Sequence, residues 1–158
     1  MDFEAQEVKN MLKNSLEYSI YKNEIIVYGV MIFAAFIVFG VIAILTQIIQ
    51  VLLVVFPLLL IYVPSLINNV RKMSLIMKFP EHCLICETIL SNPQPTFSAS
   101  IYFTVKIKDS DNMPMEQETN AIGTTRGLLK PHFSELVEKK ALVSYNELTQ
   151  AVVVIRLI

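Results

Sequence analysis

The sequence predicts an α+β membrane protein, in which a two-helix transmembrane hairpin is followed by a small antiparallel β-rich domain with one short helix. Three observations lead to this fold class. Residues 25–70 contain no Asp, Glu, Lys, Arg or His. Residues 97–108 alternate between apolar and polar side chains. Residues 141–158 hold two further apolar, strand-like runs on either side of the turn-forming sequence Asn-Glu-Leu-Thr.

The uncharged stretch is long enough for two membrane crossings. One crossing needs about 20 apolar residues, because the hydrocarbon core is about 30 Å thick and a helix rises about 1.5 Å per residue. Thr46, Gln47 and Gln50 interrupt the stretch near its middle. We therefore assign a hairpin to residues 24–70, with helices at about 25–45 and 49–67. A buried hairpin of a soluble protein is the alternative, but the polar stripe of a soluble helix is missing.

Small residues and prolines within the hairpin give further expectations. Gly29 and Gly40 lie in the first helix, together with Ala34 and Ala35, and allow another helix to approach closely. The approaching helix is either the other half of the hairpin or a helix of a partner. Pro57 removes a backbone donor and is expected to kink the second helix. Pro64 is expected to mark the point where that helix starts to end.

Positive charges predict the orientation of the hairpin. Lysines and an arginine flank both of its ends, whereas the connecting turn is uncharged. The positive-inside rule therefore predicts a multi-pass membrane protein with both termini on the cytoplasmic side, or on the equivalent side of an organelle. The flanking cationic residues are Lys9, Lys13 and Lys22 before the hairpin and Arg71, Lys72 and Lys78 after it.

Residues 1–23 predict an amphipathic helix. Val8, Leu12, Leu16 and Ile20 recur every four residues, and the charged side chains, Glu17 among them, fall elsewhere. Such a helix lies on the membrane surface, on the β-rich domain or on a partner protein. The sequence does not choose among these three positions.

Residues 71–158 predict the β-rich domain, whose clearest element is the alternating stretch at 97–108. A strand also fits residues 83–90, and a terminal hairpin fits residues 141–145 and 151–158. The other expected elements are a loop at residues 91–95, a turn at 109–112, a strand at about 116–122, and a short helix within 128–140 that Ser134 caps.

Two cysteines and two histidines are weak candidates for a metal site. His82, Cys83 and Cys86 lie close together in the sequence, and His132 could supply a fourth ligand. A single C-x-x-C is a weak signal, and residues 83 and 86 of one strand point to opposite faces. Ordinary strand cysteines are the favoured interpretation, so we predict no metal or other cofactor.

The sequence also lacks the common catalytic signatures. It contains no phosphate-binding loop, no dinucleotide fingerprint, no H-E-x-x-H and no G-x-S-x-G, and it has only four glycines. The net charge of −1 and the lack of a basic stripe argue against a nucleic-acid partner. We therefore expect a binding or scaffolding protein rather than an enzyme, with no catalytic residue to assign.

The end of the chain resembles a group of small, uncharacterised bacterial two-span membrane proteins with a β-rich cytosolic domain. The resemblance rests on Ala141-Leu-Val-Ser-Tyr-Asn146, followed by Ala151-Val-Val-Val-Ile155. That group usually has a proline soon after the Asn, where this chain has Glu147 and Leu148. The architecture is also similar to that of non-catalytic subunits of membrane protease complexes and of organellar assembly factors.

These observations lead us to expect a non-enzymatic accessory, scaffold or assembly subunit of a membrane complex. Its expected partners are the lipid bilayer and a larger integral membrane protein, or further copies of the chain. The alternatives are a bacterial immunity protein that neutralises a toxin, and a membrane-tethered domain with a minor metal site. A pore formed by oligomerisation is disfavoured, because no polar face lines either helix.

Overall fold

The computed structural model describes residues 4–96, 99–108, 113–125 and 129–158, apart from the side chain of Leu52. The chain divides into two compact units. One unit, which we call the β unit, comprises Met1–Ile20 together with Ser74–Ile158. The other, the helical unit, comprises Tyr21–Met73. The β unit therefore includes an N-terminal segment that the sequence analysis assigns to a separate helix.

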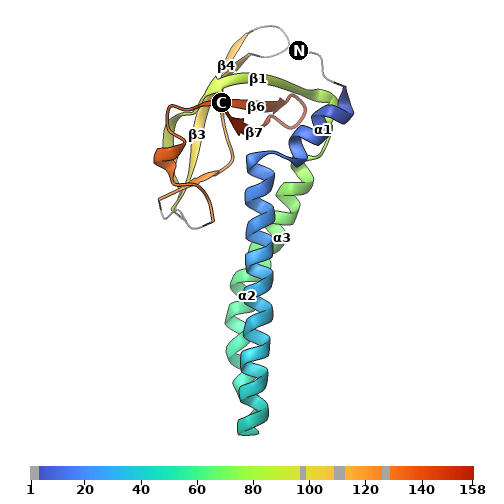
Figure 1. Ribbon diagram of the computed structural model, residues 1–158, viewed down its shortest axis with the longest axis vertical. Helices are drawn as coiled ribbons and strands as arrows, with labels where there is room; N and C mark the ends of the chain where they lie inside the picture. The colour runs from blue at the N-terminus through green and yellow to red at the C-terminus, as the bar shows by residue number, and fades with distance from the viewer. Residues whose placement is uncertain (1–3, 97–98, 109–112, 126–128) are drawn as a thin grey trace. The chain divides into compact units, whose positions relative to one another are not determined.

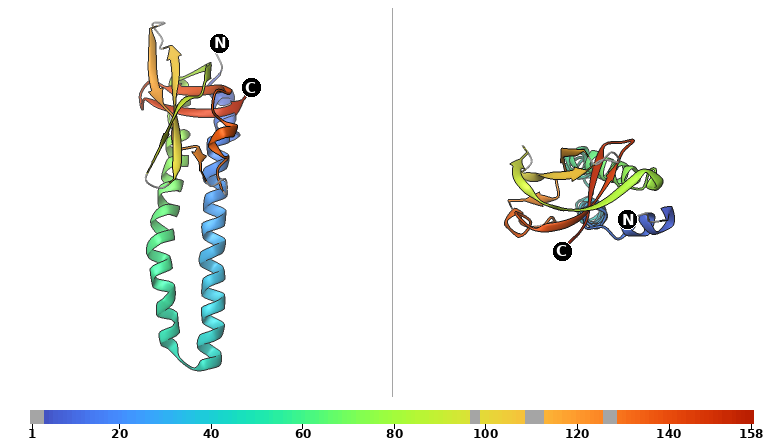
Figure 2. Two further views of the ribbon diagram at one scale, coloured as in Figure 1. Left: turned by 90° about the vertical axis from the view of Figure 1, so that its left-hand side faces the viewer. Right: turned by 90° about the horizontal axis from the view of Figure 1, so that it is seen from above.

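The helical unit contains the two long apolar helices that the sequence predicts. The first, α2, spans Leu16–Thr46, and the second, α3, spans Val55–Ile76 after a 3-10 segment, η1, at Ile49–Val54. Their most apolar windows have mean hydropathies of 2.8 and 2.4, so both are long and apolar enough to cross a membrane. Figure 2 shows the two helices side by side and antiparallel, joined by a turn at one end.

Of the expectations for the two prolines, that for Pro64 is wrong, and the kink expected at Pro57 stays a prediction. Pro57 lies in the first turn of α3, where backbone N–H groups have no acceptor within an α-helix, so the missing donor requires no kink. Pro64 does not end the helix, because α3 continues beyond it to Ile76. The α-helix also begins later than expected, since residues 49–54 form the tighter 3-10 segment.

Polar side chains within the two long helices bond to their own backbone. The Thr46 hydroxyl donates to the carbonyl of Ile42 at 2.7 Å, and the Ser65 hydroxyl donates to the carbonyl of Ile61 at 3.1 Å. Such bonds to the carbonyl four residues earlier satisfy a hydroxyl without water. They make these two residues compatible with an apolar environment.

The single helix predicted over residues 1–23 is wrong. The segment forms α1, Ala5–Lys13, and then the first turns of α2. Ser15 starts the second helix, because its hydroxyl accepts a hydrogen bond from the N–H of Tyr18 at 3.1 Å in the manner of an N-cap. Val8 and Leu12 of α1 are only 3% and 0% exposed, and α1 lies alongside β7 of the β unit.

Strands of the β unit pair around one core (Figure 1). Within the described residues they form an antiparallel sheet in the order β1-β6-β7 and a second in the order β2-β3-β4, with β5 paired to β3. The strands are β1 (Cys83–Ile89), β2 (Ser91–Pro95), β3 (Ser100–Lys108), β4 (Pro114–Glu118), β5 (Gly123–Thr124), β6 (Lys140–Asn146) and β7 (Ala151–Leu157).

Two connections link the two sheets to each other. Only Leu90 separates β1 from β2, so one bent stretch serves both sheets. The Thr88 hydroxyl donates to the carbonyl of Lys106 at 2.8 Å and accepts from its N–H at 3.2 Å, which ties this stretch to β3. On the other side, a parallel bridge joins Thr119, just after β4, to Val152 of β7.

The alternating pattern correctly predicts β3 and its buried face. Ile101, Phe103, Val105 and Ile107 are buried, and they contact core residues from the second half of the chain, including Leu136 and Val154. The predicted strand at residues 83–90 and the terminal hairpin are confirmed as β1, β6 and β7. Residues 97–98 and the predicted turn at 109–112 lie outside the described residues.

Two local predictions for the β unit are wrong, and the bounds of a third differ from those predicted. Residues 91–95 form β2 instead of a loop, because an edge strand tolerates proline and Asn92 adopts a positive φ of 47° at a register shift. The strand expected at about 116–122 is present as β4, which pairs with β3, but it ends at Glu118, and the short β5 follows at Gly123–Thr124. The expected helix is only a 3-10 turn, η3 (Phe133–Glu135), and His132 caps it instead of Ser134.

Replacing Phe103 by Ala should destabilise the β unit by about 3–5 kcal/mol, because a fully buried aromatic side chain is lost from the core. Amide hydrogen exchange of β6, followed by mass spectrometry on the full chain, measures this loss as faster exchange. The matched control is Tyr102→Ala, since Tyr102 precedes Phe103 in β3 and is only partly buried. An equal increase of the exchange rate of β6 in the two variants would contradict the placement of Phe103 in the core.

Candidate functional site

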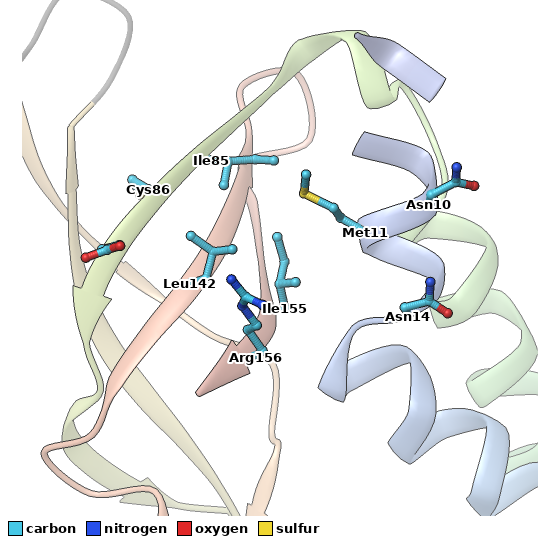
Figure 3. Close-up of a pocket in the computed structure, with 9 residues that line it drawn as sticks. Asn10, Met11, Asn14, Ile85, Cys86, Leu142, Ile155 and Arg156 are labelled. Carbon is cyan, nitrogen blue, oxygen red and sulfur yellow. The ribbon is translucent and has the colours of Figure 1, made fainter. Parts of the chain in front are cut away.

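A cleft of about 770 Å³ lies within the β unit, between α1 and the sheet β1-β6-β7 (Figure 3). Figure 3 shows Met11 pointing from α1 toward the sheet, with Leu142 and Ile155 on the opposite wall. The lining residues are Asn10 and Met11 of α1, its C-cap residue Asn14, Ile85, Cys86 and Glu87 of β1, Leu142 of β6, and Ile155 and Arg156 of β7. We refer to this feature as the α1 cleft.

The wall formed by the sheet is the face opposite the core. Val143 and Val154 belong to the core, so their neighbours along the strands point the other way, toward α1. On that face Val153 and Ser144 are buried, whereas Leu142 is only partly covered. The nine-residue α1 thus covers one part of the face and leaves the α1 cleft over the rest.

A β-bulge explains why two successive residues of β7 line the α1 cleft. Val143 pairs with Val154, whereas the preceding Leu142 pairs with Arg156, so Ile155 is an extra residue in β7. Neighbouring residues of a regular strand point to opposite faces, and a bulge interrupts that alternation. Ile155 supplies buried apolar surface to the cleft, and the exposed Arg156 supplies a cation beside it.

The α1 cleft carries two opposite charges across an apolar centre. The strand register pairs Leu142 with Glu87 on one side and with Arg156 on the other. Strands lie about 4.8 Å apart, so the two charged residues start about 10 Å from each other on the backbone. Neither side chain forms an ion pair or hydrogen bond with any residue that the structure describes. Both charges are therefore available to a ligand.

A buried carboxylate lies close to this sheet. Glu17, in the first turn of α2, is 0% exposed. Its Oε2 accepts a hydrogen bond from the N–H of Val154 at 3.3 Å, and its Oε1 accepts one from the side-chain amide of Asn120. Burying a carboxylate is costly unless such donors surround it. The sequence analysis places Glu17 on the charged side of a helix, and no local signal indicates its burial.

The helical unit has a polar seam that the sequence analysis also missed. The side-chain amide of Asn69 in α3 donates to Oε2 of Glu24 in α2 at 2.8 Å, and both residues are buried. The rings of Tyr28 and Tyr62 lie 5.5 Å apart between their centroids. Because the partners are distant in the sequence and lie near the ends of the apolar stretch, hydropathy does not reveal their pairing.

The structure does not bring the four candidate metal ligands together. The register pairs Cys83 with Asn146 and Cys86 with Val143, which places the cysteines on opposite faces of β1. His82 ends the short 3-10 turn η2, Pro80–His82, and His132 accepts or donates a 2.7 Å hydrogen bond with Ser134 at η3. Among the described residues, no three His, Cys, Asp or Glu side chains are grouped for a metal ion.

The two thiols have different surroundings. The side-chain amide of Asn146 lies 3.5 Å from the sulfur of Cys83. Cys86 packs against the core, and burial raises the pKa of its thiol. A raised pKa keeps a thiol protonated at neutral pH and makes it a poor nucleophile. The chemistry of Cys86 therefore favours a structural role at the edge of the α1 cleft.

No family model matches the chain, and neither the curated proteins nor the solved structures include a significant match. The resemblance based on residues 141–155 therefore remains a prediction.

Alkylation should reveal the raised pKa of Cys86. In a Cys83→Ser variant, iodoacetamide should modify Cys86 of the folded chain more slowly at pH 8 than it modifies the same residue in guanidinium. The rate of the folded protein should continue to rise at pH values where the rate of the unfolded chain levels off, because fewer thiols are ionised at a given pH. Coinciding pH–rate profiles would show that burial does not affect this thiol.

Replacing Glu17 by Ala should weaken the β unit, because it leaves the Val154 N–H and the Asn120 amide without an acceptor. The cost is about 1–3 kcal/mol for each buried donor left unsatisfied. Hydrogen exchange at Val154 measures the effect. Glu17→Gln retains one acceptor oxygen and should lose less stability. The exposed Glu7 of α1 provides the control, and a Glu7→Ala variant that loses as much as Glu17→Ala would refute this role.

Proposed function

We propose that the chain is a non-enzymatic accessory or assembly subunit of a membrane protein complex. The two long helices cross the bilayer as a hairpin and pack against helices of a larger integral membrane protein. Residues 1–24 and 71–158 lie together on the cytoplasmic side, or the equivalent side of an organelle, as the flanking lysines and arginine favour. There the β unit contacts the same partner.

The observation that carries this proposal is the uncovered surface of the hairpin. In the most apolar windows of the two helices, 0% and 6% of the residues are buried. Exposed side chains occur all along both helices, for example Phe33 and Ile44 on α2 and Leu60 on α3. Exposing such a surface to water is unfavourable, which supports its being covered by lipid and by helices of a partner.

The small residues of α2 favour a protein partner on one face. A Cβ atom added at Gly29 or at Gly40 would have no heavy atom within 4 Å, so α3 does not occupy the space beside either glycine. The two glycines are eleven residues apart, about three helical turns, and therefore share one face of α2. Small residues allow close helix–helix packing in membranes, where apolar side chains alone give no preference over lipid.

The face of α2 that carries Gly29 and Gly40 provides a test of the proposed function. The full chain, solubilised from its native membrane in a mild detergent, should co-purify with a larger integral membrane protein. The double variant Gly29→Leu/Gly40→Leu should lose most of that partner, because two bulky side chains prevent close packing of helices. The matched control is Val30→Leu/Val41→Leu, one residue further along, where both positions are already occupied by exposed apolar side chains.

Recovery of the chain alone from mild detergent would contradict the proposal. Equal recovery of the partner with the glycine and valine variants would contradict the role of the glycine face. Circular dichroism of the purified variants checks that both remain helical, so a loss of partner is not confused with a loss of fold.

A further inference from the structure

We propose that the α1 cleft binds an extended peptide segment of a partner protein, in which apolar residues separate one basic from one acidic residue. The inference rests on the proposed function, because it describes how the β unit of an accessory subunit recognises its partner. It follows from the charges, the spacing and the amide groups of the cleft.

The charges define what the occupant must carry. Glu87 and Arg156 are both exposed and flank Leu142 in one cross-strand row. A ligand with a cation near Glu87 and an anion near Arg156 would pair with both, and its apolar part would lie over Leu142. Opposite charges arranged in this way favour a bipolar ligand over one of either single charge.

The spacing favours a peptide over a lipid. The backbone positions of the two charged residues are about 10 Å apart. In an extended chain, residues four apart point to the same face and lie about 13 Å apart, so flexible Lys and Glu side chains at that separation reach both charges. A lipid head group with an anion alone would meet Arg156 but would be repelled by Glu87. In a zwitterionic head group the phosphate and the ammonium are separated by only two carbon atoms, which is too short for this row.

The α1 side of the cleft offers bonds to a peptide backbone. Asn10 and Asn14 are one helical turn apart and line the cleft with their exposed side chains. Neither side-chain amide forms a hydrogen bond with another residue in the described part of the chain. An amide supplies both donors and an acceptor, which an extended backbone requires. The cleft volume of about 770 Å³ is within the range of small-ligand and peptide sites.

The test uses the full chain in nanodiscs of phosphatidylcholine and three fluorescent peptides with blocked ends. The peptides contain Lys-Leu-Val-Leu-Glu, Glu-Leu-Val-Leu-Glu or Lys-Leu-Val-Leu-Lys between Gly-Ser flanks, and fluorescence anisotropy gives their Kd values. The first peptide should bind about fivefold more tightly than the other two, because only it pairs with both charges.

Charge reversal makes the test specific. Arg156→Glu should shift the preference to the peptide with two lysines, and Glu87→Arg should shift it to the peptide with two glutamates. A merely destabilised protein would lose affinity without changing its order of preference. Lys106→Glu, an exposed charge reversal on β3 outside the cleft, should leave the order unchanged.

Three results would overturn the inference. The first is that no peptide binds, and the second is that all three bind equally. The third is that short-chain phosphatidylglycerol displaces the bound peptide in an Arg156-dependent manner, which would make a lipid the occupant. Co-purification of the wild-type chain separates this inference from the proposed function. A wild-type chain that recovers its partner but shows no peptide preference refutes only the inference, whereas a wild-type chain without any partner refutes the proposed function.

Discussion

The lack of Asp, Glu, Lys, Arg and His in residues 25–70 is the constraint that determines the organisation of the chain. A stretch this apolar is stable only where its backbone bonds internally, and α2 and α3 meet that requirement. The same constraint applies to side chains. The hydroxyls of Thr46 and Ser65 bond to the carbonyl four residues earlier. Glu24, just before the stretch, pairs with the buried amide of Asn69.

The β unit depends on smaller local features. The Ser15 cap separates α1 from α2 and allows α1 to lie along β7. The bulge at Ile155 then brings Arg156 to the same side as the apolar wall, where it lies across Leu142 from Glu87. Without either feature the α1 cleft would lack its helix or its cation. The recognition that we propose therefore depends on one N-cap and one extra residue.

Sequence patterns predicted the elements whose signals are local. The alternation that ends at Lys108 is sufficient to define β3, and a hydropathy window is sufficient to define both long helices. Strand β2 was not predicted, because a strand tolerates prolines only at a sheet edge. Its edge position depends on its pairing with β3, which the local sequence does not show. The sequence pattern also does not separate α1 from α2, since the four-residue repeat continues past Ser15.

The candidate site was not predictable for a related reason. The α1 cleft requires the register that pairs Leu142 with both Glu87 and Arg156, and that register joins three strands from distant parts of the chain. The four residues that spacing suggested as metal ligands, His82, Cys83, Cys86 and His132, follow a local pattern that the fold does not assemble. Burial of Glu17 likewise arises only when its helix meets Val154 and Asn120.

The central claim of this account is that the hairpin crosses the bilayer and returns both ends of the chain to one side. Single cysteines introduced by Gln50→Cys in η1 and by Glu81→Cys in η2 test it most directly, in a chain that also carries Cys83→Ser and Cys86→Ser. In sealed membranes, an impermeant maleimide should label residue 50 from one side and residue 81 only from the other. Labelling of both positions from the same side would contradict the account.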